Sequence, residues 1–153
     1  MSESIPGPLE PTSDERTMAT LAQVLQLVGW WIAPLVIFLV KRDSRFVSFH
    51  ALQALLLQVI WMAFGVALTV GWMAIIFSTV AFHPHGSNAP PPPVFLLFPL
   101  FFLGWMFVWA GMLVIAIVYG IKASRGEWAA YPVIGPPARR ILKIAPDGTP
   151  LPA

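Results

Sequence analysis

The sequence predicts an all-α integral membrane protein: a helical bundle with three transmembrane helices, a kinked first span and an interfacial helix before the second. Two observations support this fold class. Of the 153 residues, 58% are hydrophobic and only 10% are charged, whereas about a quarter of the residues in soluble proteins are charged. Three stretches also reach the roughly 20 apolar residues that a helix needs to cross a bilayer, namely residues 18–40, 56–81 and 94–121.

The N-terminal region divides into a tail and the first span. Residues 1–12 are rich in proline and poor in apolar surface, so we expect a disordered tail. Thr12 and Glu15 have the spacing of a capping box, which predicts a helix start. Pro34 predicts a kink in the middle of the span. We expect the kinked crossing, which places the N-terminus outside; the alternative, a re-entrant segment, would leave it in the cytoplasm.

A charged joint at residues 41–58 separates the first two apolar runs. The uncharged run behind it, residues 51–82, would be about 48 Å long as a helix and so exceeds the bilayer core. We therefore expect residues 45–57 to form an interfacial helix. Basic residues favour the cytoplasmic side, and the predicted topology anchors are Lys41, Arg42, Arg45, Lys122 and Arg125.

These anchors predict a multi-pass protein of the cell inner (cytoplasmic) membrane. Residues 41–50 and the C-terminus would face the cytoplasm, and the 83–93 loop, which lacks Lys and Arg, would lie outside. Because the basic residues sit at the ends of apolar runs, they indicate topology and no nucleic-acid partner. The expected partners are the lipid bilayer, other membrane proteins or a second copy of the chain.

The residue inventory argues against an enzyme. Cysteine is absent, which excludes thiolate chemistry and disulfides. No Asp, Glu, Lys or Arg lies between Arg45 and Lys122, so the usual signature of an ion pathway is missing. His83 and His85 offer two imidazoles where a metal site needs three or four ligands. We therefore predict no catalytic residues, no cofactor and no metal site.

Four sequence segments carry a family resemblance. They are Asp14-Glu15-Arg16 with the run to Ala22, then Pro34-Leu35-Val36-Ile37-Phe38-Leu39-Val40-Lys41-Arg42-Asp43, then Phe46-Val47-x-Phe49-His50-Ala51-x-Gln53-Ala54-Leu55-x-x-Gln58, and last Ile121-Lys122-Ala123-x-Arg125-Gly126-Glu127-Trp128-x-x-Tyr131-Pro132. In this order they resemble the small bacterial membrane proteins called Tic-twenty-like, over residues 14–132. Leu56 departs from the asparagine usual in that family. The plant relative is regarded as four-helical, which leaves open that the first segment is in part a hairpin.

The resemblance implies a membrane domain at residues 13–132. The residues that follow, 133–153, mix prolines with basic residues, and we expect a flexible cytoplasmic tail there. The resemblance assigns no mechanism, because most bacterial members lack an assigned function. We expect a non-enzymatic accessory or scaffold protein in membrane-protein handling, and the alternative is a component of a small oligomeric channel or transporter. The candidate interaction site joins polar and aromatic positions of the joint and the tail, namely Phe46, His50, Gln53, Gln58, Glu127 and Tyr131.

Overall fold

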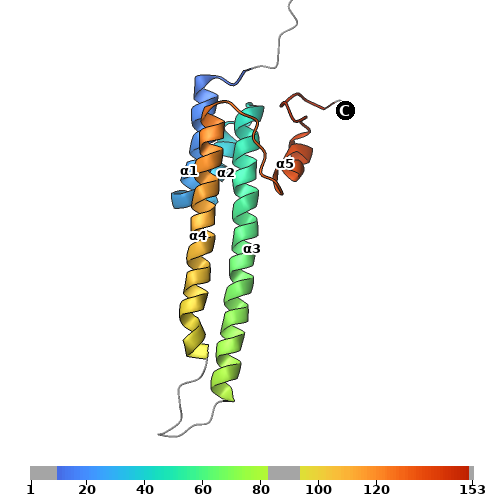
Figure 1. Cartoon of the computed structure of the whole chain (residues 1–153). Helices are drawn as coiled ribbons and strands as arrows, with labels where there is room; N and C mark the ends of the chain where they lie inside the picture. Colours follow the sequence, from blue (N-terminus) through green and yellow to red (C-terminus); the bar gives the residue numbers. More distant parts are fainter. Residues whose placement is uncertain (1–9, 83–93, 152–153) are drawn as a thin grey trace, which may run out of the picture. The chain divides into compact units, whose positions relative to one another are not determined.

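The computed structural model describes residues 10–82 and 94–151, and within these ranges the regular secondary structure is helical, apart from one isolated β-bridge between Ile144 and Pro150 (Figure 1). The helices are α1 (Ser13–Gly29), α2 (Ile32–Val40), α3 (Arg45–Ala81), α4 (Val94–Ser124) and α5 (Gly135–Leu142). The all-α fold class is thereby confirmed for these residues. The expectations for most of the 1–12 tail and for the 83–93 loop lie outside the described part of the chain.

The first apolar segment is two helices that form a hairpin, and it is not one kinked crossing. The chain breaks at Trp30, whose φ of 51° is unusual for a residue with a side chain. Beyond this break α2 packs back on α1. The ammonium of Lys41, just after α2, lies 2.7 Å from the carboxylate of Asp14 in the first turn of α1. The two ends of the hairpin therefore meet on one side, contrary to the expected kinked crossing.

The start of α1 follows the prediction closely. The Thr12 side chain accepts the Glu15 backbone N–H at 3.2 Å, and the Glu15 carboxylate accepts the Thr12 backbone N–H at 2.8 Å. This reciprocal pair is the expected capping box, and it satisfies two donors that a helix start otherwise leaves without partners.

Two helices are long and apolar enough to cross a membrane, by length and composition: Arg45–Ala81 and Phe95–Ser124. Almost none of the side chains in their apolar windows are buried, which sets them apart from the core helices of a soluble protein. The expected third transmembrane helix is not confirmed, because α1 and α2 turn back on each other.

The chain divides into two compact units. The first comprises residues 1–59 and 113–153, and the second comprises residues 60–112. The second unit holds aromatic contacts between α3 and α4. Trp72 stacks on Phe101 with ring centroids 4.6 Å apart, and Trp61 meets Trp105 edge-on at 5.6 Å. Gly65 also lies against the Trp105 ring, so the helices pair through rings and a small residue.

The first unit contains the structural core, and this corrects the interfacial-helix prediction. Helix α3 runs without a break from the joint into its apolar half. Its first turns, expected at the lipid surface, are instead packed inside protein, with the aromatic rings of Phe46 and Phe49 3% and 0% exposed. The polar residues in these turns are therefore core residues.

The C-terminal region, which the sequence suggested is a flexible tail, contains a helix and buried side chains among its described residues. Helix α4 ends in a Schellman motif: Gly126 has a φ of 79°, its N–H bonds the Ala123 carbonyl, and the Glu127 N–H bonds the Lys122 carbonyl. The chain then returns along the first unit and forms α5. Ile134 and Ile144, on either side of this helix, are 5% and 2% exposed.

Candidate functional site: a glutamine cluster under the C-terminal segment

All four glutamines of the chain are buried in the first unit, which has few other buried polar side chains. Gln23 and Gln26 come from α1, whereas Gln53 and Gln58 come from α3, and none is more than 7% exposed. Together with His50 and Tyr131 they form what we call the glutamine cluster. A buried amide is costly unless it is hydrogen-bonded, so the partners of these side chains define what the cluster does.

Gln53 holds the segment that follows α4. Its Oε1 accepts the backbone N–H of Tyr131 at 2.6 Å, and its Nε2 donates to the carbonyl of Ala129 at 3.2 Å. One side-chain amide thus pairs with a backbone donor and a backbone acceptor two residues apart, much as a neighbouring strand would. Gln53 fixes the position of this segment on α3.

His50, one turn before Gln53, makes the second attachment. Its Nε2 lies 3.1 Å from the carbonyl of Glu127. Because a carbonyl can only accept, this nitrogen carries the proton, and Nδ1 is left to accept from the Gln23 amide at 3.4 Å. The Gln23 Nε2 also donates to the His50 carbonyl at 3.1 Å. The imidazole therefore joins α1 to the segment after α4.

Tyr131 closes the network from the other side. Its hydroxyl donates to Oε1 of Gln23, and its ring meets Tyr119 of α4 edge-on, with centroids 4.2 Å apart. Burial raises the pKa of the Tyr131 phenol above its ordinary value of 10.0. The hydroxyl accordingly stays protonated and acts as a donor.

Gln58 and Gln26 extend the network along the α1 and α3 contact. The Gln58 amide donates to the Gln26 carbonyl at 2.9 Å, and the Gln26 amide donates to the Gln23 carbonyl at 2.8 Å. Among the described residues the buried Oε1 of Gln26 has no hydrogen-bond partner. This part of the cluster ties α1 to α3 and does not touch the C-terminal segment.

Aromatic side chains cover the cluster. Trp128 packs edge-on against Phe46, with ring centroids 5.1 Å apart, and lies 5.7 Å from Phe49. Arg139 of α5 sits over the Phe49 ring at 5.5 Å and donates to the Trp128 carbonyl at 3.2 Å. These contacts exclude water from the amide bonds, which strengthens them, and they anchor α5.

The structure brings most of the predicted interaction site together. Phe46, His50, Gln53 and Tyr131 share one buried region, and Gln58 lies further along α3. Glu127 takes part through its backbone carbonyl only, and its residue is exposed. Of the topology anchors, Lys41 pairs with Asp14. The others lie at the helix ends where the sequence places them: Arg42, Arg45, Lys122 and Arg125.

Sequence reasoning missed the contribution of α1. Gln23 and Gln26 are three residues apart in a segment without charge, which puts them on one helix face. They are the only side-chain amides of this segment, and from this pattern a buried polar contact of α1 could have been predicted. Trp128 and Arg139 were also missed as partners, since their contacts depend on how the chain returns after Gly126.

The arrangement is suited to holding backbone in place. Its side chains are amides, one imidazole and one phenol, and most of their bonds run to backbone groups. Among the residues that the structure describes, no three His, Asp or Glu side chains gather closely enough to hold a metal ion. Whether the cluster is also an interaction site stays a prediction.

Comparison with known proteins corrects the family assignment. The model of the MamF/MmsF family, described as the magnetosome magnetite crystal formation protein family, matches residues 14–138. The resemblance to Tic-twenty-like proteins is therefore wrong as an assignment, although the match covers the same segments. No curated protein and no solved structure matches the chain.

Proposed function

Because the chain belongs to the MamF/MmsF magnetosome magnetite crystal formation protein family, we propose that it takes part in magnetite crystal formation as a non-enzymatic component of the magnetosome membrane. The observation that carries this proposal is the family match, which runs from the first turn of α1 into α5. It includes every residue of the glutamine cluster. The earlier expectation of a role in membrane-protein handling depended on the other resemblance and is not retained.

The geometry supports a scaffold in preference to a catalyst. The buried polar groups pair with backbone, as Gln53 does with Ala129 and Tyr131. Such bonds fix the shape of a surface, and within the described residues of the cluster they leave no pair of titratable side chains poised to exchange a proton. A scaffold for crystal growth needs a defined surface at the membrane, which the packed first unit would supply.

The proposed topology has two crossings, by α3 and α4, with the α1 and α2 hairpin entering the bilayer from one side and returning. The Asp14 and Lys41 ion pair supports this, as does the cationic end of α4. The N-terminus, the joint and the C-terminus would then share the cytoplasmic side. Reporter fusions at residue 12 and after residue 151 should give the same compartment, and opposite compartments would contradict the two-crossing arrangement.

The alternative of a channel component has less support in the described residues. A pore needs a polar stripe along a span, but the hydroxyls of Ser78 and Thr79 in α3 both donate to the carbonyl of Ile75 in their own helix. Iron flux through reconstituted protein, abolished by substitutions at these hydroxyls, would favour the channel over the scaffold.

The direct test is genetic complementation in the source cell. A strain without this chain is supplied with the wild-type chain or with Gln53→Leu, and magnetite crystals are measured by electron microscopy. We expect the wild type to restore crystal size and number. We expect Gln53→Leu to be present in the membrane but to restore them only in part. Crystals that are the same with and without the chain would overturn the proposal.

A further inference from the structure

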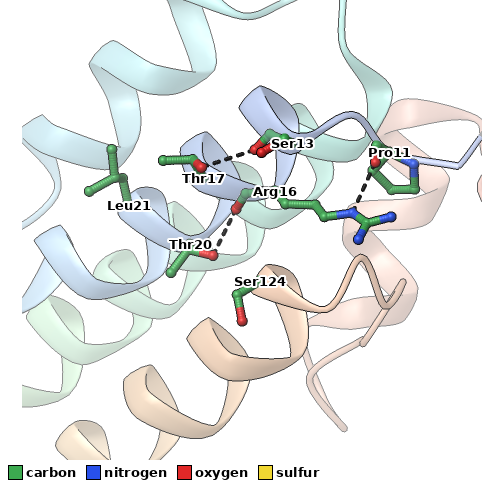
Figure 2. A pocket seen from close by; sticks show the side chains of 7 residues that line it. All are labelled: Pro11, Ser13, Arg16, Thr17, Thr20, Leu21 and Ser124. Carbon is green, nitrogen blue, oxygen red and sulfur yellow. Dashed lines mark hydrogen bonds between the residues drawn. The ribbon is translucent and has the colours of Figure 1, made fainter.

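A cavity of about 530 Å³ opens between the first two turns of α1 and the end of α4 (Figure 2). This volume is in the range of small-molecule sites. All of its lining residues belong to the first unit, and most are polar: Pro11, Ser13, Arg16, Thr17, Thr20, Leu21 and Ser124. The glutamine cluster contributes none of them.

Arg16 is the cationic group of the cavity. Its Nε donates to the Pro11 carbonyl at 2.9 Å, which fixes the guanidinium (Figure 2). The group also lies over Gly126, where an added Cβ would stand 3.0 Å from Nε. Among the described residues its terminal nitrogens have one charged neighbour, the exposed Glu10 carboxylate at 3.9 Å. The fork of a guanidinium held this way suits a phosphate.

Toward a ligand, three hydroxyls of the cavity are available mainly as acceptors, because each already donates its proton to a carbonyl of its own helix. Thr17 donates its proton to the Ser13 carbonyl at 2.9 Å, Thr20 to the Arg16 carbonyl at 2.7 Å, and Ser124 to the Ile121 carbonyl at 2.7 Å. Each oxygen keeps lone pairs for an incoming donor. The cavity therefore offers one fixed cation and several acceptors, which is the complement of a group with a negative end and a donor-bearing end.

The carboxylates around the cavity determine what net charge it accepts. Asp14 is paired with Lys41, and Glu15 is bound in the capping box. The Ser44 hydroxyl, together with this capping box, holds the pKa of Glu15 below its ordinary value, so the carboxyl is ionised. With Glu10 beside Arg16, these carboxylates offset the charge of Arg16 and favour a ligand that brings its own cation.

Exposed apolar side chains lead away from the cavity on both helices. On α1, Leu21 lines the cavity, and Leu25 and Val28 follow on the same face. On α4, Ser124 is preceded at helical spacing by Ile121 and Ile117, which are both 47% exposed. A polar cavity above apolar helix faces, at the end of a candidate span, has the layout of a lipid headgroup above its acyl chains.

We propose that this cavity binds the headgroup of a zwitterionic phospholipid, phosphatidylethanolamine. Arg16 takes the phosphodiester, the oxygens of Thr17, Thr20 and Ser124 take the ammonium, and the acyl chains lie along the exposed faces of α1 and α4. The site is independent of the role in crystal formation, so either proposal can fail without the other.

Native mass spectrometry of the full chain in detergent tests the site with three lipids. Phosphatidylethanolamine should bind about tenfold more tightly than phosphatidylcholine, because the choline group has the same charge but no N–H to donate, and a charge-assisted hydrogen bond is worth roughly one decade of affinity. Phosphatidylglycerol should also bind less tightly. Equal binding of all three, or equal binding of soluble glycerophosphoethanolamine, would overturn the assignment to this lipid.

Two variants locate the binding. Arg16→Gln should lower the affinity for phosphatidylethanolamine about tenfold, whereas Arg140→Gln, which removes an exposed cation of α5, should leave it unchanged within twofold. Since Arg16 also supports Pro11, thermal unfolding is measured alongside. Thr17→Trp fills the cavity from an exposed position and serves if Arg16→Gln unfolds. A folded Thr17→Trp chain that keeps the wild-type lipid preference would refute the site.

Discussion

Replacing Gln53 with leucine should release the segment after α4 from α3. The change removes both bonds of the Gln53 amide, at 2.6 Å to the Tyr131 N–H and at 3.2 Å to the Ala129 carbonyl. A buried backbone group left without its partner costs about 1–3 kcal/mol. Two such groups give about 2–6 kcal/mol, which is large against the roughly 5–15 kcal/mol that stabilises a typical domain.

Hydrogen exchange read by mass spectrometry measures this release, with the protein in lipid nanodiscs. A loss of about 2 kcal/mol or more in local opening free energy corresponds to amide exchange at least about 30-fold faster in peptides covering residues 126–138. The Tyr131 N–H loses its acceptor directly. Peptides from the apolar half of α3 should be unaffected, because they make no bond to this segment among the described residues.

Gln58→Leu is the matched control. It removes the same kind of side chain from the same helix, yet its amide donates to the Gln26 carbonyl and to none of the described residues after Gly126. Exchange in 126–138 should stay at the wild-type rate in this variant. If Gln53→Leu also left exchange there unchanged, or if both variants accelerated it equally, the reasoning that Gln53 holds this segment would be refuted.

Three further predictions concern other positions. Burial raises the pKa of Tyr131, so the stability that its neutral phenol contributes is present below pH 10 and is lost as the pH rises above 10. Tyr131→Phe should weaken this alkaline loss in thermal unfolding scans, and an unchanged pH profile would contradict the assignment. Gly148→Ala should destabilise the chain by about 1–3 kcal/mol, because φ there is 84° and a Cβ would overlap the Trp128 indole; unaltered exchange around Trp128 would count against it. Gly29→Ala should loosen the hairpin, because a Cβ would stand 2.7 Å from that of Ala33, and faster proteolysis near residue 30 would report it.

The parts of the fold that local sequence controls were predictable. The capping box at Thr12 and the apolar runs depend on residues close together in the chain, and both are present in the structure. The reversal at Trp30 was not predictable in this way, because a tryptophan with positive φ breaks the usual preference for glycine. A proline kink at Pro34 was the simpler interpretation of the same break.

The candidate site was predictable in its residues and not in its arrangement. His50, Gln53 and Tyr131 stand out as polar or aromatic positions beside apolar runs, and the structure buries all three. Their partners could not be derived, since the contacts of Gln53 and Tyr131 with one another span 78 residues and run largely to backbone atoms. A backbone carbonyl is the same in every residue type, so the identity of Ala129 could not indicate that it accepts a hydrogen bond from Gln53.

The distances in sequence across the glutamine cluster also constrain how the protein is made. Gln23 is synthesised early, but His50 follows it by 27 residues and Tyr131 by 108. Until both have been translated, the Gln23 amide lacks its long-range partners. The hairpin that carries it can therefore take its final place in the first unit only after Tyr131 has been synthesised.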